Sequence, residues 1–468
     1  MSHSNQGSVA SQAETLQRQF AQAPGLPFAE LLAPELIEEL FRKHQVKTRD
    51  RIYTPLITLA MFLSQCHDED PSLRQAVARL LAHRCVQELP PCDSDTGAYC
   101  KARQRLPEKV LSDLTRHTGK QLMLDAPARW SWHGRDVKII DGSTASMPDT
   151  PENQKEYPQM TSQKPGIGFP ILRLLVIFSL AVGTVLDAAF GPYKGKQTSE
   201  LALLRTLHDN FQEGDVALTD RHFCSFFEIA ELQRRGVDVV MRMHQKRKTD
   251  FRRGVQLGRY DHLVTWKKPA RPEWMDEETY RQYPDTLTMR EVRVRLTAKN
   301  SRSRVITIAT TLLEANEYRK ADLAELYRRR WDAELHLRSL KTVLHMDVLR
   351  CKTPAMVRKE IWAHLLAYNL VRKVMAQAAQ KHHVKPHTIS FKATLQTLKA
   401  FALPLLTFPR GALQAVIATM LKAIARHQVG NRPDRLEPRA LKRRPKPYDL
   451  LTKPRKEARK LETQNSCG

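Results

Sequence analysis

The segment between residues 137 and 243 alternates short apolar runs rich in β-branched residues with amphipathic stretches, and this alternation is what most limits the folds open to the chain. The runs VKIIDGS, ILRLLVIFSL, TVLDAAFGPY, DVALTD and VDVVMRM have the composition of buried strands, the second and third joined by a turn at Ala181 to Gly183. SELALLRTLHDNF and SFFEIAELQRRG have helical spacing, the first opened by Ser199 as an N-cap. The order predicts a mixed α/β fold with strand, hairpin, helix, strand, helix and strand.

Two of the strand-like runs carry an aspartate at or near their carboxyl ends, Asp141 in VKIIDGS and Asp220 in DVALTD. A third acid, Glu334, lies in a later helix that is expected to pack beside the sheet. Each acid by itself is more often structural than functional. Three convergent carboxylates, however, are the ligands that hard divalent cations prefer. The sequence therefore predicts a site for two Mg²⁺ ions about 3.5 to 4 Å apart, with Mn²⁺ as a substitute.

Glu334 belongs to the stretch YRRRWDAELHLRSLK, whose other polar residues of interest are Tyr327, Arg330 and Lys341. On an α-helix that turns about 100° per residue, offsets of three, seven and fourteen bring these four side chains within about 60° of one another. Such a face suits a phosphodiester, because the carboxylate ligates a cation while the phenol, guanidinium and ammonium groups bind phosphate oxygens. The alternative is a solvated helix face with an Arg-to-Glu pair at i, i+4.

The formal net charge of +26 and the pI near 9.9 indicate a polyanionic partner, and nucleic acid is favoured over a membrane surface. The longest largely apolar run, Leu174 to Leu186, is too short to span a bilayer and is followed by Asp187. The first residues lack the basic and then apolar pattern of a signal peptide, which predicts a cytoplasmic protein.

The cysteine content fits a reducing compartment, since the seven cysteines form no C-x-x-C pair. A zinc site is the alternative use for some of them, although their spacings match no standard site. Its candidate ligands are Cys66, Cys85, Cys92, Cys100, His67 and His83.

The stretch from Tyr327 to Lys341 matches without a gap the signature Y-x2-R-x3-E-x6-K of the insertion sequence 4 family of bacterial DDE transposases, which this chain resembles. IIDGS is similar to the first-aspartate motif of that family, with Asp141. LTDRHF is similar to the second, with Asp220 followed by Arg221. LHMDVLRCKTPAMVRKEIWAHLLAYNLVR is similar to the segment after the signature, and the resemblance covers about residues 130 to 375.

The resemblance implies a ribonuclease-H-like catalytic core interrupted by a β-rich insertion, and cut-and-paste chemistry at transposon ends. A metal-activated water would cut the end, and the freed 3′ hydroxyl would attack target DNA. The protein would be bacterial and associated with the nucleoid, and it would act as a homodimer on transposon ends and target DNA. The acids Asp141, Asp220 and Glu334 would be catalytic and hold the metal ions. The residues implied to bind DNA phosphates are Tyr327, Arg330, Lys341 and Arg221.

One departure from the family pattern concerns a tryptophan that holds a flipped base in members forming a hairpin intermediate. Residues 297–326, close upstream of the signature, contain no tryptophan. Trp266 or Trp274 could stack on the base instead, with ordinary packing as the alternative. Two other functions also stay open: a catalytically inactive DNA-binding protein of the same fold, and a ribonuclease-H-like nuclease that only hydrolyses.

The pattern along the whole chain predicts seven segments. These are disordered residues 1–20, a helical N-terminal domain at 21–130, the first part of the core at 131–243, a basic β-rich insertion at 244–312, the second part of the core at 313–380, C-terminal helices at 381–430, and a basic tail at 431–468, extended until it binds DNA.

The helices of the N-terminal domain carry six basic residues that are candidates for DNA contact: Arg74, Arg79, Arg84, Lys101, Arg103 and Arg105.

Overall fold

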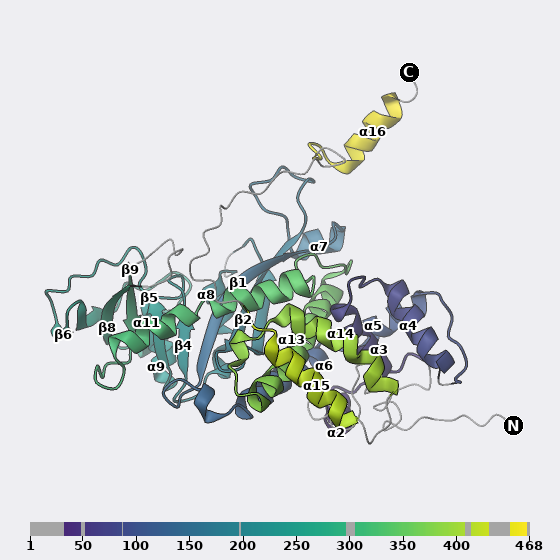
Figure 1. The fold of residues 1–468 in the computed structure, drawn as a ribbon. Coiled ribbons are helices and arrows are strands. Elements are labelled where there is room, and N and C mark those ends of the chain that lie inside the picture. The colour runs from purple at the N-terminus through teal and green to yellow at the C-terminus, as the bar shows by residue number, and fades with distance from the viewer. Residues whose placement is uncertain are drawn as a thin grey trace.

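The structure, a computed structural model, contains a nine-stranded sheet with helices gathered against its faces and at one end (Figure 1). The strand order is β3-β2-β1-β4-β5-β9-β8-β7-β6. The described residues are 32–47, 52–86, 88–195, 198–295, 305–407, 413–429 and 450–465. The segment predicted to be disordered, residues 1–20, lies outside them.

The first five strands form a ribonuclease-H-like arrangement. β1 pairs antiparallel with β2, and β2 with β3, while β4 lies parallel to β1 and β5 lies parallel to β4. The predicted order of strands and helices is confirmed, with Ser199 capping α8 through a 3.2 Å hydrogen bond from the Ala202 amide. The elements are β1 (Val137–Ser146), β2 (Ile171–Ser179), β3 (Val185–Pro192), α8 (Glu200–Arg205), β4 (Val216–Thr219), α9 (Phe226–Arg234) and β5 (Asp238–Arg242).

The β-rich insertion continues the core sheet, because β9 pairs antiparallel with β5. Arg290 of β8 is buried and bonds both carboxylate oxygens of Asp261 on β7, at 2.8 and 2.7 Å. β7 begins at Asp261, directly after Tyr260, which lies in a turn at φ +59°. The short helix α10 lies between β7 and β8. The elements are β6 (Val255–Gly258), β7 (Asp261–Lys267), α10 (Glu277–Gln282), β8 (Thr286–Arg295) and β9 (Val305–Thr310).

Helix α13 (Pro354–Lys381) is buried along most of its length and joins the sheet to the helical side of the molecule. Leu59 of α3 and Leu114 of α6 lie in the same hydrophobic core as Leu365 of α13. Besides the helical stretch from Lys320 to Val343, the remaining helices are α2 (Pro34–Lys43), α3 (Pro55–His67), α4 (Leu73–Val86), α5 (Gly97–Arg105), α6 (Glu108–Leu124), α7 (Pro151–Glu156), α14 (Phe391–Thr407), α15 (Leu413–Arg426) and α16 (Arg455–Asn465), with 3-10 turns at Ala128–Trp130, His208–Asn210 and Pro386–Thr388. Among all the residues that the structure describes, no helix is long and apolar enough to cross a membrane.

A single buried side chain, Asn369 of α13, connects three elements. Its Oδ1 accepts from the amide of Val185 on β3 at 2.8 Å, and its Nδ2 donates to the Val185 carbonyl at 2.9 Å. Nδ2 also lies 3.2 Å from the Thr115 carbonyl of α6. Helix α6 comes so close here that a Cβ on Gly119 would lie 2.0 Å from the Val185 carbonyl oxygen. The sheet, α6 and α13 are therefore fixed relative to one another at this point.

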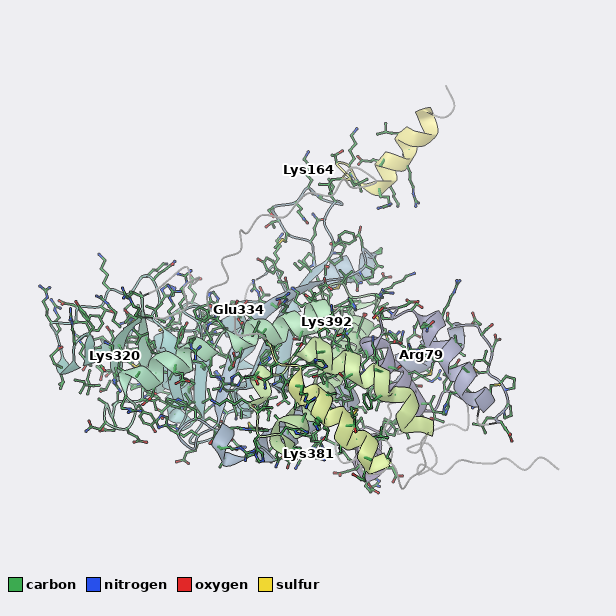
Figure 2. The ribbon with its side chains drawn as sticks, in the orientation of Figure 1. Arg79, Lys164, Lys320, Glu334, Lys381 and Lys392 are labelled. Atoms are coloured by element: carbon green, nitrogen blue, oxygen red, sulfur yellow. The ribbon has the colours of Figure 1, made fainter. Side chains whose placement is uncertain are left out.

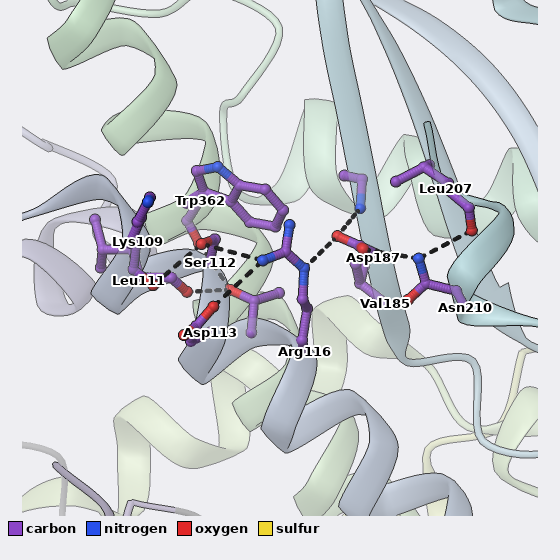
Figure 3. A network of polar contacts seen from close by, with 12 residues as sticks. Lys109, Leu111, Ser112, Asp113, Arg116, Val185, Asp187, Leu207, Asn210 and Trp362 are labelled. Atoms are coloured by element: carbon purple, nitrogen blue, oxygen red, sulfur yellow. Dashed lines mark hydrogen bonds and ion pairs between the residues drawn. The ribbon is translucent and has the colours of Figure 1, made fainter. Parts of the chain in front are cut away.

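A second link between α6 and the sheet is polar and centres on Asp187 (Figure 3). Arg116 of α6 donates from Nε to Asp187 Oδ1 at 2.8 Å, and the Asn210 side chain donates to Asp187 Oδ2, also at 2.8 Å. The Arg116 guanidinium lies over the ring of Trp362 on α13, 5.2 Å from its centroid. Asp187, which directly follows the apolar run Leu174 to Leu186 in the sequence, is thus buried and paired.

Two expectations about basic residues need correction. Arg103 is buried and cannot contact DNA from the surface, because its guanidinium packs over Phe62 and donates to Cys351 Sγ at 2.9 Å. The basic tail is not extended throughout, since α16 forms where Arg and Lys alternate with Glu and Ala, which are good helix formers. Of the other N-terminal candidates, Arg74, Arg79, Lys101 and Arg105 are exposed.

We predict that Asn369→Ala lowers the free energy of unfolding by about 3 kcal/mol or more, because it leaves the buried amide and carbonyl of Val185 without their partner. Chemical denaturation of the full-length protein measures this. Gln380→Ala, at an exposed position of the same helix, is the matched control and should change stability by less than about 0.5 kcal/mol. Equal stability of the two variants would contradict the role assigned to Asn369.

Candidate active site

The register of two neighbouring parallel strands brings Asp141 and Asp220 together. β1 pairs with β4 at Val137↔Val216, Lys138↔Ala217 and Ile139↔Leu218. The same register continued for two residues on each strand places Asp141 opposite Asp220. The expectation that Asp141 ends its strand is wrong, because β2 stays paired with β1 as far as Ser146. Asp141 instead follows the end of the pairing with β4, where that edge of β1 is open.

The stretch that carries Glu334 is not the single regular helix that its spacing predicts. α11 (Lys320–Arg329) ends before Arg330, α12 (Asp332–Arg338) follows, and a π-helical turn (Ser339–Val343) contains Lys341. The Arg330 amide donates to the Tyr327 carbonyl, and the Ala333 amide to the Arg330 carbonyl, each at 3.1 Å. These i→i−3 bonds tighten the backbone, so a constant turn of about 100° per residue does not describe the segment.

A cleft of about 630 Å³ opens between the sheet edge and this helical stretch. All three predicted acids line it, although they come from three separate elements. In Figure 2, Glu334 lies near the centre of the molecule, on the helical stretch that crosses in front of the sheet. The cleft residues that matter chemically are Asp141, Asp220, Glu334, Arg330, Lys341 and Asp347.

Arg330 connects two of the three acids. Its Nη2 lies 2.7 Å from Glu334 Oε1, and its Nη1 lies 3.7 Å from Asp141 Oδ2. The Arg330 side chain is only 11% exposed, whereas that of Glu334 is 57% exposed. One cationic group is therefore close to both carboxylates at once.

The pKa of Asp141 is raised to about 6. Burial is the main cause, and the negative charges of Asp220 and Glu334 raise the pKa further. The Arg330 guanidinium and the Gly142 amide lower it, but by less than burial raises it. Because Asp220 and Glu334 both raise the pKa of Asp141, the three acids repel one another, and a bound cation would relieve this repulsion.

The donor set fits a hard divalent cation, because it consists of carboxylates from converging elements. Among the described residues, no group of three or more His, Cys, Asp or Glu side chains is spaced to hold a metal as it stands. In the cleft, the guanidinium of Arg330 lies between Asp141 and Glu334. The same finding leaves the alternative zinc site without support, because the cysteines and histidines proposed for it form no such group in this part of the chain.

The predicted phosphate-binding residues differ in their surroundings. Lys341 lines the cleft, and its Nζ lies 3.3 Å from Ser143 Oγ. Tyr327 is buried, and its phenol oxygen accepts a hydrogen bond from Arg330; burial raises the pKa of this phenol. Arg221 is exposed but lies outside the residues that line the cleft, and it bonds Gln245 Oε1 at 3.1 Å. Of the four predicted phosphate-binding residues, Arg330 and Lys341 therefore line the cleft with their charged groups.

Asp347 is a cleft residue that the sequence analysis missed. Its carbonyl accepts from the amide and hydroxyl of Ser146 at 3.3 and 3.2 Å, so the end of β1 fixes the segment after the π-helical turn. The apolar pattern of this strand ends near Gly142 in the sequence, so it gives no indication that Asp347 lies beside the strand. The only sequence feature that could have suggested Asp347 as a site residue is its position shortly after Lys341.

The two candidate tryptophans differ in how accessible their rings are to a base. Trp266 is buried, donates from Nε1 to Glu291 Oε1 at 2.8 Å, and has the Arg247 guanidinium 3.7 Å from its ring centroid. Trp274 is 43% exposed, and the guanidinium of Arg205 covers one face of its ring at 3.6 Å.

Residues 132–370 match the family model described as Transposase DDE domain. The chain is 27% identical over 364 residues to the transposase InsG for insertion sequence element IS4 of Escherichia coli (strain K12), covering 76% of this chain and 78% of that protein. It is 40% identical over 65 residues to the transposase for insertion sequence element IS421 of Escherichia coli, covering 14% and 18%. A cryo-EM structure of a piggyBac transposase synaptic complex with hairpin DNA gives a TM-score of 0.43 at 13% identity, covering 85% of each chain.

We predict that Arg330→Gln lowers stability in metal-free buffer by about 2 kcal/mol and enlarges the rise in Tm that Mg²⁺ produces. The three carboxylates repel one another without the guanidinium, and a divalent cation relieves this repulsion. Thermal unfolding with and without Mg²⁺ measures both effects. Arg329→Gln is the matched control, since Arg329 bonds Asp332 and the Leu180 carbonyl instead. An Mg²⁺ response equal to that of the wild type in both variants would refute a shared cation site.

Proposed function

The chain belongs to the DDE transposase family, whose members catalyse DNA cleavage and strand transfer, and on this premise we propose that the cleft lined by Asp141, Asp220 and Glu334 is its catalytic centre. The observation that carries the proposal is that three acids from separate elements line one cleft and that a single guanidinium is close to two of them. The reaction is cut-and-paste transposition of an insertion sequence.

Asp141, Asp220 and Glu334 would hold the divalent cations, with Mg²⁺ as the physiological ion and Mn²⁺ as a substitute. When bound, two such ions activate an attacking oxygen and stabilise the leaving oxygen in a displacement at phosphorus. The acids reach the cleft from β1, from the residue directly after β4, and from α12, so the packing of the core holds this arrangement.

Arg330 and Lys341 bind the phosphate next to the scissile bond. With a divalent cation held by Asp141 and Glu334, the Arg330 guanidinium would be available to bind a phosphate oxygen. Tyr327 is buried behind Arg330 and hydrogen-bonds to it, so it orients the guanidinium instead of contacting DNA itself. Arg221, outside the cleft, contacts the DNA backbone further along the strand.

The partner is DNA, in agreement with the net charge of +26. The protein acts as a homodimer that holds two transposon ends and then joins them to target DNA. It works on chromosomal DNA, which places it at the bacterial nucleoid. The helical segment 21–130, the insertion and the basic tail supply further DNA contacts.

We predict that Asp220→Asn lowers strand cleavage about a thousandfold, because each metal ion supplies several kcal/mol of transition-state stabilisation and each 1.4 kcal/mol is a factor of ten. The assay is cleavage and strand transfer with Mg²⁺ on DNA ends taken from inverted repeats that flank the gene. Asp209→Asn is the control, since Asp209 is an exposed aspartate near the same strand. DNA binding should persist in both variants.

Full activity of Asp220→Asn would rule out the role assigned to this residue. Cleavage without any strand-transfer product would indicate the hydrolytic nuclease, and salt-dependent binding without cleavage by the wild type would indicate the inactive DNA-binding protein.

A further inference from the structure

The glycine that follows Asp141 in β1 is required for space. Gly142 is not in the left-handed backbone region, so its conformation alone would accept another residue. A Cβ at this position would, however, lie 2.2 Å from Oε1 and 2.4 Å from Cδ of Glu200. Glycine inside a strand often marks the close approach of another group. Here the approaching group is a carboxylate, directly beside the predicted catalytic aspartate.

Glu200 reaches β1 from the face of the sheet opposite to Asp141. Ile139 belongs to the hydrophobic core that contains α13, whereas Ile140 belongs to the second core with Leu204 of α8. Side chains alternate along a strand, so Asp141 lies on the face of Ile139, and position 142 lies on the face of Ile140. Because Gly142 has no side chain, the Glu200 carboxylate lies directly against the backbone of β1, one residue from Asp141.

The Glu200 carboxylate has no hydrogen-bond or ion-pair partner among the residues that the structure describes, although it is partly buried. Burial raises the pKa of Glu200, and the charge of Asp220 raises it further, while His222 and Arg173 lower it. Glu200 is therefore within electrostatic reach of Asp220. A purely structural role remains the competing explanation, because an acid in the first turn of α8 stabilises the helix N-terminus.

We propose that Glu200 is a fourth acidic residue of the catalytic centre, which binds the divalent cation together with Asp141 and Asp220, and that Gly142 admits it. This inference rests on the proposed function, since it assumes the metal site in the cleft. It gives the centre a ligand from the α8 side of the sheet, in addition to Glu334 from the α12 side.

The test is Mn²⁺ binding to the full-length protein without DNA, measured by electron paramagnetic resonance, with thermal unfolding in parallel. We expect Glu200→Gln to weaken Mn²⁺ binding about 10-fold or more. Gly142→Ala should weaken it similarly without unfolding the protein, because the new methyl group meets the flexible end of Glu200 and displaces it. The double variant should bind no more weakly than either single variant, since both changes remove the same contact. Glu152→Gln, in the first turn of the equally short α7, is the control.

Each outcome decides between the explanations. Wild-type affinity in Glu200→Gln, with or without a lower Tm, overturns the inference and leaves Glu200 as a helix-end acid. Additive losses in the double variant overturn the role of Gly142. If Glu200→Gln is unaffected but Asp220→Asn loses Mn²⁺, the proposed function stands and only this inference fails. If the wild type binds no Mn²⁺, or Asp220→Asn binds it normally, the metal site itself fails.

Discussion

The parallel pairing of β1 with β4 is the constraint on which the catalytic arrangement depends. Ile139 and Leu218 face each other in this register, and both are fully buried in the main core. A slip of one residue would turn these side chains toward the opposite face of the sheet, so hydrophobic burial fixes the register strongly. Two residues further along, the same register places Asp141 beside Asp220. The buried ion pair of Lys138 with Asp215, at the other end of the pairing, adds a polar contact that a slipped register would break.

Most of the core fold could be predicted, because each of its strands and helices is indicated by a pattern within its own short stretch of sequence. The alternation of apolar runs and capped helices fixed the order of β1 to β5, and Gly183 marked the hairpin turn. The joining of the insertion to the core sheet could not be predicted, since the pairing of β9 with β5 is a contact between distant segments. The interruption at Arg330 also escaped prediction, because helical propensity does not distinguish i→i−4 from i→i−3 bonding within a polar stretch.

The acids of the site could be selected from the sequence, but their surroundings could not. Residue spacing puts Tyr327 on the same face as Glu334, yet packing buries the phenol and leaves the glutamate exposed. Arg330 was expected to bind phosphate, whereas in the structure it contacts Glu334, Asp141 and Tyr327. Glu200 and Asp347 carry no spacing signal, because each reaches the site through tertiary contacts with β1. Gly142, directly after Asp141, was the one local sequence feature indicating that another group, the Glu200 carboxylate, lies close to this strand.

The central claim is that Asp141, Asp220 and Glu334 hold the same divalent cations. Anomalous diffraction from crystals of the full-length protein soaked in Mn²⁺ tests it most directly. The account predicts anomalous peaks in the cleft within about 2.5 Å of carboxylate oxygens from all three residues, with Arg330 turned away from Asp141. Peaks that lie elsewhere, or that contact only one of the three acids, would contradict it.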